Sequence, residues 1–413
     1  MCSEGALRGN NDSIRRFIKI YPWFTGLTGD LLFYIAIDTL FLTIVKSFSA
    51  AQIVSLLSLS QLACIIIQFP ILFIIKKIGN TASVRMSAFL LLMSAVFITV
   101  GNNYYLVLLG RIFHDAAAIF RSSSVVALEN NLELLDDRSD FVRVRASGNT
   151  VYSIITMLIS FVVSYMFNYN NYLPMICCIA TCTIGFILSL FMRDCSDYNK
   201  ISRGKSPKHK AKVHYSKLII ITVVVYSIFY PIVNNGQREG KLFIQQHLLL
   251  DFDIEETALI IGVVVCASRI IRVLSNIIFV KIYRKYQSKM GVALPCLLCF
   301  SMGCLLFGSF VPQIVIKILL MALGYAIILF VRDPFKLYIQ DEVLGSTAKE
   351  QHQTLLTILE FGVKIVDAGI GLGFSAILVG YPMVVVMAII FAVSLIEIAL
   401  SVWLYRTIAI GKS

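Results

Sequence analysis

The amino-acid sequence predicts an all-α membrane protein with twelve transmembrane helices in two pseudo-symmetric bundles of six. Of its 413 residues, 58% are hydrophobic and only 15% are charged, whereas soluble proteins have about 25% charged residues. Most of the 36 Lys and Arg residues lie in alternate loops and helix ends, and the opposite loops contain only Lys46. This alternation predicts a multi-pass protein of the cell membrane with both termini in the cytoplasm.

Apolar stretches of about 20 residues predict the individual helices. The first stretch follows a polar, basic N-terminal segment that lacks the cleavage site of a secretory signal, which indicates an uncleaved anchor. The loops on the side of Lys46 are very short, so consecutive helices are expected to pack as antiparallel neighbours. In chain order, the predicted helices span 21–45, 51–75, 83–101, 104–128, 147–167, 172–192, 217–248, 256–280, 290–310, 313–340, 354–378 and 382–405.

The two halves of the sequence contain the same landmarks in the same order. Each half opens its second helix with a capping-box pattern, in which a polar N-cap residue is followed three positions later by Gln or Glu. The two patterns are Ser49 with Gln52 and Asp253 with Glu256. Each of these helices ends in a basic turn, at 76–79 and at 281–285. The repeat predicts a duplicated six-helix unit.

A long hydrophilic segment separates the two predicted bundles. The bundles occupy 1–192 and 218–413, and the basic segment 193–217 is expected to be a solvated cytoplasmic linker. The net charge of +12 follows the membrane topology and does not gather on one soluble face. Anionic lipid headgroups are therefore the expected partner of the basic residues, and nucleic acid is not.

Charged side chains within the predicted spans are the candidates for function, because a charge at the centre of a bilayer costs about 3 kcal/mol on insertion scales. The candidates for proton coupling are Asp30 and Asp38 in the first helix and Arg111, His114, Asp115 and Arg121 in the fourth. Matching depths across antiparallel helices pairs Asp38 with Arg111 and Asp30 with Arg121. Asp38 is the expected proton carrier, while the pair near the inner end could instead only hold the bundle together.

The C-terminal half contains the candidates for substrate binding: Asn234, Arg238, Glu239, Arg269, Arg272, Arg332, Asp333, Glu360, Lys364 and Asp367. Arg269 and Arg272 share a helix face with no acid on their own helix, which suits a carboxylate or phosphate ligand. They could instead pair with Asp333 or Asp367 of other helices. Glu360, Lys364 and Asp367 also share one face, so Lys364 could bridge both acids in a purely structural triad.

Twelve helices, cytoplasmic termini, a six-plus-six repeat and a basic central linker together resemble the major facilitator superfamily. The loop from Lys76 to Thr81 is similar to the superfamily motif G-x-x-x-D-R/K-x-G-R-R/K, but Lys76 stands where the motif has Asp. In the fourth helix, Arg111 matches a position that the resemblance implicates in proton coupling, and His114 and Asp115 replace a Gln-Gly pair. The Gly-Pro signature of drug-proton antiporters is missing from 147–167, which argues against a standard drug exporter.

The resemblance implies a secondary active transporter that moves a small organic solute by alternating access of two bundles. Protons are favoured over sodium as the coupling ion, because titratable side chains are present and no discontinuous helix is evident. The acids of the first helix slightly favour efflux of an amphipathic compound. Arg269 and Arg272 favour the alternative, uptake of an anionic metabolite. A transport-inactive sensor or assembly protein with the same bundles is the third hypothesis.

The sequence gives little support to other kinds of chemistry. It contains no phosphate-binding loop, and its Ser, His and acidic residues form no clustered catalytic set, so an enzyme is not expected. Cys177, Cys178 and Cys182 have no companion His or carboxylate at metal-ligand spacing. We therefore expect no cofactor and no metal site, and a monomer whose partners are its solute, protons and membrane lipids.

Overall fold

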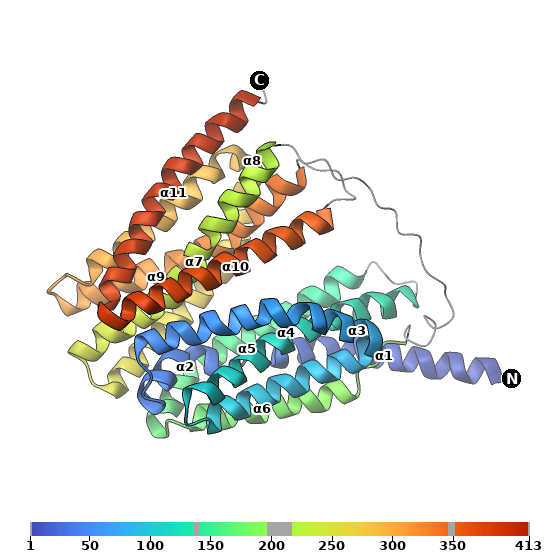
Figure 1. The fold of residues 1–413 in the computed structure, drawn as a ribbon. Helices are drawn as coiled ribbons and strands as arrows, with labels where there is room; N and C mark the ends of the chain where they lie inside the picture. Colours follow the sequence, from blue (N-terminus) through green and yellow to red (C-terminus); the bar gives the residue numbers. More distant parts are fainter. Residues whose placement is uncertain (1, 136–139, 196–216, 346–351, 412–413) are drawn as a thin grey trace. The chain divides into compact units, whose positions relative to one another are not determined.

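The computed structural model describes residues 2–135, 140–195, 217–345 and 352–411. This described part is helical and contains no strand. Its helices are α1 Cys2–Thr28, α2 Tyr34–Leu40, a π-helical turn Phe41–Val45, α3 Ala50–Val100, α4 Tyr104–Glu133, α5 Phe141–Tyr169, α6 Leu173–Leu190, α7 Lys217–Asp251, α8 Ile254–Gly308, α9 Ile314–Gly345, α10 His352–Gly380 and α11 Met383–Gly411 (Figure 1).

The described helices provide the twelve predicted passes, because α3 and α8 each contain two of them. Gly79 interrupts α3 with φ 81° and ψ 171°, a conformation that only glycine adopts readily. Helix α8 has 55 residues, or roughly 80 Å if straight, whereas the hydrocarbon core of a bilayer is about 30 Å thick. Helix α2 and the π-helical turn continue the first pass after α1. The fold class expected from sequence is confirmed.

Apolar and charged passes are distinct among the described helices. Seven helical segments are long and apolar enough to cross a membrane, and they come from α3, α5, α6, α8, α9, α10 and α11. Helices α4 and α7 are not among these seven, and they carry many of the charged candidate residues. Because charges avoid lipid, these two helices are expected to present their charges to protein or to a wet cavity.

The predicted helix caps are present at the start of both α3 and α8. The backbone N–H of Ser49 donates to Oε1 of Gln52 at 3.0 Å, and the backbone N–H of Gln52 donates to Oγ of Ser49 at 3.3 Å. This reciprocal pair is a complete capping box. At α8, the N–H of Glu256 donates to Oδ1 of Asp253 at 2.8 Å. Both capping predictions are confirmed. They can be made from sequence because each cap depends only on residues that are neighbours in the chain.

The chain divides into two compact units. Unit 1 comprises Met1–Phe41 and Ser60–Lys210, and unit 2 comprises Leu42–Leu59 and Ala211–Ser413. The beginning of α3 therefore groups with the second unit, where the carbonyl of Ala51 accepts a hydrogen bond from Ser375 Oγ at 2.8 Å. Most of the predicted linker, residues 196–216, lies outside the described residues, so its role stays a prediction.

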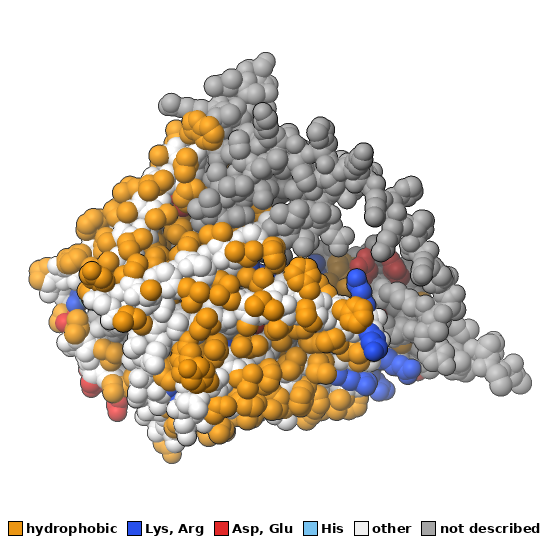
Figure 2. Space-filling view, in the orientation of Figure 1, with side chains coloured by type: hydrophobic (Ala, Val, Ile, Leu, Met, Phe, Trp, Pro, Cys, Tyr) orange, Lys and Arg blue, Asp and Glu red, His pale blue; other side chains and the backbone are white. Residues whose placement is uncertain are grey.

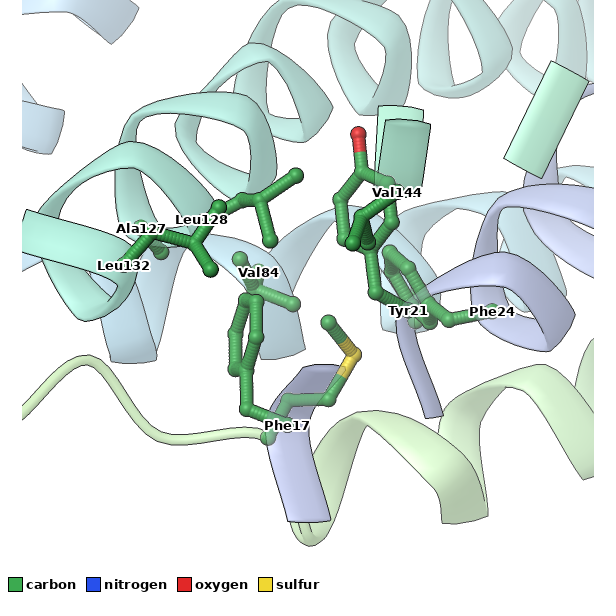
Figure 3. Packing of buried hydrophobic residues seen from close by; sticks show 10 residues of the cluster. Phe17, Tyr21, Phe24, Val84, Ala127, Leu128, Leu132 and Val144 are labelled. Carbon is green, nitrogen blue, oxygen red and sulfur yellow. The ribbon is translucent and has the colours of Figure 1, made fainter. Parts of the chain in front are cut away.

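The core of unit 1 is built around α1. Phe17, Tyr21 and Phe24 of α1 pack with residues of α3, α4 and α5 in one buried cluster (Figure 3). Small residues allow a close approach on the other sides of α1. A Cβ on Gly26 would lie 2.6 Å from Val151 of α5, and one on Gly185 of α6 would lie 2.5 Å from Thr28. These contacts hold the C-terminal end of α1 between α5 and α6.

Unit 2 has a comparable packing of helices around α7 and α8. Helix α7 packs against α9, α10 and α11, and α8 packs against α9 and α11. The hydroxyl of Ser301 donates to the carbonyl of Gly324 at 2.7 Å, which links α8 to α9. A Cβ on Gly324 would lie 2.7 Å from that neighbouring backbone, so glycine is required for the approach.

The surface of unit 1 has the two zones expected of a membrane protein. Apolar side chains cover its helices, while Lys and Arg gather at the end near the start of α1 (Figure 2). Among the side chains of unit 1 that the structure describes before α4, the exposed basic residues are Arg15, Arg16, Lys19, Lys76, Lys77 and Arg85. The protein is therefore a multi-pass membrane protein with one strongly basic end on unit 1.

Candidate functional site

The first pass is broken in its middle, which the sequence did not predict. Helix α1 ends at Thr28, and α2 begins at Tyr34 after a short non-helical stretch. Within this break, Oδ1 of Asp30 accepts the backbone N–H of Leu31 at 2.8 Å. The expectation of a continuous helix over 21–45 is wrong, because tertiary contacts satisfy the backbone groups that the break exposes.

Arg121 of α4 stabilises the end of α1 at this break. Its Nη1 donates hydrogen bonds to the carbonyl of Thr28 and, at 2.5 Å, to the carbonyl of Gly29. These carbonyls have lost the partners that a continuous helix would supply. A cation at a helix C-terminus also interacts favourably with the helix dipole. Arg121 therefore anchors the break. Asp30, the partner that the sequence analysis expects for Arg121, lies close enough for an electrostatic interaction with it.

Asp30 instead contacts His114, which bridges two carboxylates. Nε2 of His114 lies 2.9 Å from Oδ1 of Asp30, and Nδ1 lies 3.2 Å from Oδ1 of Asp115. The side chains of the three residues are only 16–25% exposed. Asp30 therefore contacts His114 in the middle of α4, whereas the sequence analysis pairs it with Arg121 nearer the inner end.

The two contacts of His114 have a consequence for proton binding. A neutral imidazole has one N–H and can donate to only one of its two neighbours. With both carboxylates ionised, one ring nitrogen would then face a carboxylate oxygen without a hydrogen between them. Both hydrogen bonds exist only if the trio Asp30, His114 and Asp115 holds one further proton, either on the imidazole or on a carboxylate. The trio can therefore bind and release a proton.

Arg111 lies among several carboxylates of unit 1. It interacts electrostatically with Asp115, Asp30 and Asp38. We expected Asp38 as its single partner, whereas the structure distributes the charge of Arg111 over all three acids. Oδ1 of Asp38 accepts the backbone N–H of Thr39 at 2.8 Å. Arg111 thus offsets part of the negative charge of the trio.

In unit 2, Asp367 joins α10 to α7. Its Oδ1 accepts hydrogen bonds from Nδ2 of Asn235 at 2.7 Å and from Nη2 of Arg238 at 2.8 Å. Asp367 is buried, and Glu239 beside Arg238 is buried as well. The predicted triad on α10 did not include these partners from α7, and the side chain of Glu360 lies outside the described residues. Asp367 therefore links α10 to α7, in addition to any contact with Lys364 on its own helix.

A second ion pair joins α8 to α9. Nε and Nη2 of Arg272 bind the two oxygens of Asp333 at 2.7 and 3.1 Å, a bidentate arrangement. The neighbouring Arg332 donates from Nη1 to Oε1 of Gln237 on α7 at 2.6 Å. Of the two alternatives for Arg272, the structure shows pairing with another helix. Arg269 forms no hydrogen bond or ion pair with any described residue, and its Nε is buried without a partner.

Two buried acids were missed by the sequence analysis. Glu397 of α11 is 1% exposed, and neither of its carboxylate oxygens has a hydrogen-bond partner among the described residues. Asp194, assigned to a solvated linker, is instead 2% exposed and accepts hydrogen bonds from Asn80 at 2.7 Å and Asn130 at 2.8 Å. In the sequence, the one signal for Glu397 is its isolated position within a long apolar stretch.

Comparison with known proteins identifies the family of this fold. Residues 23–345 match the sequence profile of the Major Facilitator Superfamily. The chain belongs to the Major Facilitator Superfamily. No curated protein sequence matches the chain. The match covers most of both units, and it agrees with the twelve passes found in the described residues.

Solved structures of superfamily transporters have a similar fold. A mutant of the nucleoside transporter NupG has a TM-score of 0.72 and 10% identity, with coverage of 95% of this chain and 99% of that chain. The POT family transporter PepTSo has a TM-score of 0.69 and 9% identity, with coverage of 96% of this chain and 98% of that chain. A bacterial homologue of the iron transporter ferroportin has a TM-score of 0.60 and 11% identity, with coverage of 95% and 98%.

Membership of the superfamily establishes the general activity. The protein is a secondary transporter of small-molecule substrates, and it is not an enzyme. One feature of the superfamily is built differently here. Lys76 replaces the motif Asp, and the adjoining segment is held by Asn80, whose amide bonds to Asp194. A buried acid that follows α6 thus fixes this part of unit 1.

Proposed function

We propose that this superfamily member is a proton-coupled transporter of a small organic solute, and that Asp30, His114 and Asp115 form its proton-binding centre. The two hydrogen bonds of His114 carry this proposal, because they require a proton that the trio can lose. Loss of that proton removes one hydrogen bond and leaves two carboxylates with less compensation inside a membrane span. Protonation is thereby linked to the contact between α1 and α4.

The break in the first pass supports protons over sodium as the coupling ion. Backbone carbonyls freed at broken helices can coordinate Na⁺ in transporters. Here the guanidinium of Arg121 binds the carbonyls of Thr28 and Gly29. These oxygens are therefore already engaged by a fixed cation, and the titratable trio remains the better candidate for coupling.

The orientation proposed for the protein follows from the charge distribution. The basic end of unit 1 is assigned to the cytoplasm of a cell membrane, where positive residues accumulate. This places both termini on the cytoplasmic side, with anionic lipid headgroups next to the exposed Lys and Arg. We propose that the protein works as a monomer.

The structural neighbours suggest classes of solute for a first screen. Two of these neighbours are the nucleoside transporter NupG and the POT family transporter PepTSo. The sequence offered efflux of an amphipathic compound as the slightly favoured hypothesis and uptake of an anionic metabolite as the alternative. A transport-inactive sensor is the third hypothesis, and it predicts no flux of any solute.

Proton flux in proteoliposomes tests the proposal. Vesicles that contain the purified protein and an entrapped pH-sensitive dye are challenged with nucleosides, dipeptides and organic acids. A transported solute should change the internal pH in wild-type vesicles, and His114→Gln should abolish this change while solute exchange continues. The matched control is His247→Gln, since His247 of α7 lies outside the trio. Solute-driven proton flux that survives in His114→Gln would remove the trio from the mechanism.

A further inference from the structure

The interior of unit 2 has more basic than acidic side chains. Among the described side chains in the interiors of its helices, the bases are Arg238, Lys241, Arg269, Arg272, Arg332, Lys336 and Lys364. The corresponding acids are Glu239, Asp333, Asp367 and Glu397. Each uncompensated charge within a span is costly, so such an excess needs a compensating anion or access to water.

Two of these acids are already committed to arginines. Asp333 forms the bidentate pair with Arg272, and Asp367 forms the pair with Arg238. Glu239 lies beside Arg238 and Asp367 and interacts electrostatically with both. The arginines outside these pairs are Arg269 and Arg332, which have no carboxylate partner among the described residues.

Arg269 and Arg332 both lie close to the pair of Arg272 and Asp333. Arg269 is one helical turn from Arg272 on the same face of α8. Arg332 is adjacent to Asp333 on α9, and the neutral amide of Gln237 accepts its hydrogen bond at 2.6 Å. Both side chains are half-buried, and each has a buried Nε without a partner. Each member of this ion pair thus has a second arginine close to it on its own helix, Arg269 on α8 and Arg332 on α9.

The chemistry of this arrangement selects one kind of ligand. A guanidinium presents several N–H donors in a planar fork that matches the oxygens of a carboxylate or phosphate. Neutral solutes would leave both positive charges uncompensated in a region of low dielectric. Cationic solutes would be repelled.

We infer that unit 2 binds the carboxylate or phosphate group of an anionic solute between Arg269 and Arg332. This inference rests on the proposed transport function and specifies its solute class. It favours the anionic alternative over the amphipathic one. Arg272 is a positioning residue in this site, because its guanidinium is already engaged by Asp333.

Thermal unfolding of the purified full-length protein in detergent tests the inference. The probes are succinate, adenosine monophosphate and inorganic phosphate, with sodium chloride at matched ionic strength as the reference. At least one probe should raise the melting temperature of the wild type in a saturable manner. Arg269→Gln and Arg332→Gln should each weaken the apparent affinity by about tenfold or more, as expected for a lost hydrogen bond to a charged group.

Controls separate specific binding from general effects of salt and folding. Lys289→Gln removes an exposed positive charge of unit 2 and should respond to the probes as the wild type does. General stabilisation by phosphate salts should be equal in all variants. If a glutamine variant fails to fold, Arg269→Lys keeps the charge but loses the fork, and it should still bind more weakly than the wild type.

Two results would overturn the inference. One is a wild type that none of the three probes stabilises beyond the chloride reference. The other is an unchanged response to the effective probe in folded Arg269 and Arg332 variants. Probe binding in detergent needs no proton gradient, so His114→Gln should bind normally. Failure of proton coupling and failure of anion binding are therefore distinguishable.

Discussion

Nε2 of His114 on α4 lies 2.9 Å from Oδ1 of Asp30, at the point where the first pass is broken. This contact ties a titratable group to the least regular backbone of that pass. Because Nδ1 of the same ring contacts Asp115, the protonation of the trio and the position of α1 depend on each other.

Asp30→Asn should abolish solute-driven proton flux while solute exchange continues. The amide cannot take up a proton, but it keeps the shape of the side chain and can still hydrogen-bond to His114. Asp38→Asn should reduce the flux less, because Asp38 is not part of the trio. Proton flux and exchange of the same solute are measured in proteoliposomes. Equal loss in both variants would return Asp38, the carrier expected from sequence, to the mechanism.

Arg121→Gln should lower the stability of the protein by about 1–3 kcal/mol, because two backbone carbonyls lose charged donors. Arg121→Lys should restore part of the loss, since one ammonium can reach fewer acceptors in a fixed geometry. The measurement is the melting temperature in detergent. Arg143→Gln is the control, because Arg143 is 77% exposed and should contribute little. An unchanged melting temperature in Arg121→Gln would show that the break needs no anchor.

Glu397→Gln should leave stability within about 1 kcal/mol of the wild type, because an uncharged side chain of similar volume replaces a buried carboxyl group without partners. Glu397→Lys should strongly reduce expression of folded protein, since it buries a new unpaired charge. Size-exclusion profiles and melting temperatures of both variants provide the measurement. A large loss of stability in Glu397→Gln would indicate a specific partner for the carboxylate.

Cys195 should react slowly with a water-soluble maleimide at neutral pH. Burial raises the pKa of the Cys195 thiol above its ordinary value, so less of the reactive thiolate is present. Because the pKa of Cys195 is raised, its labelling rate should begin to increase at a higher pH than the rate of an exposed cysteine. The experiment uses a background in which the other cysteines are replaced. Arg193→Cys in a background that also lacks Cys195 is the exposed control, and equal rates for both cysteines would contradict the prediction.

Cysteines introduced at Asn170 and Gly380 should react with an impermeant thiol reagent added outside intact cells. Asn170 follows α5 and Gly380 is the last residue of α10, at ends of passes where the sequence has few Lys and Arg residues. Cysteines at Lys208 and Lys349, which lie outside the described residues, should be protected until the membrane is opened. The reverse labelling pattern would invert the orientation.

Sequence alone determined the features that depend on neighbouring residues along the chain. Hydropathy predicted the twelve passes, because each needs only a sufficient length of apolar residues. The capping residues Ser49 and Asp253 were predicted, because a helix cap is closed within four residues. The superfamily followed from the number and repetition of these local elements. Sequence also assigned the charged candidate residues to their passes.

Only the tertiary structure decided which charges meet. Depth along a helix can be counted from sequence, but the rotation of the helix and the distance to its neighbours depend on packing by residues far apart in the chain. His114 and Arg121 lie two turns apart on one face of α4, and Asp30 contacts His114 while Arg121 binds the carbonyls of Thr28 and Gly29. Arg272 forms an ion pair with Asp333, whereas Arg269, one turn away on the same helix, does not. Several partners of similar depth compete for each charge, and close packing permits only one arrangement of them.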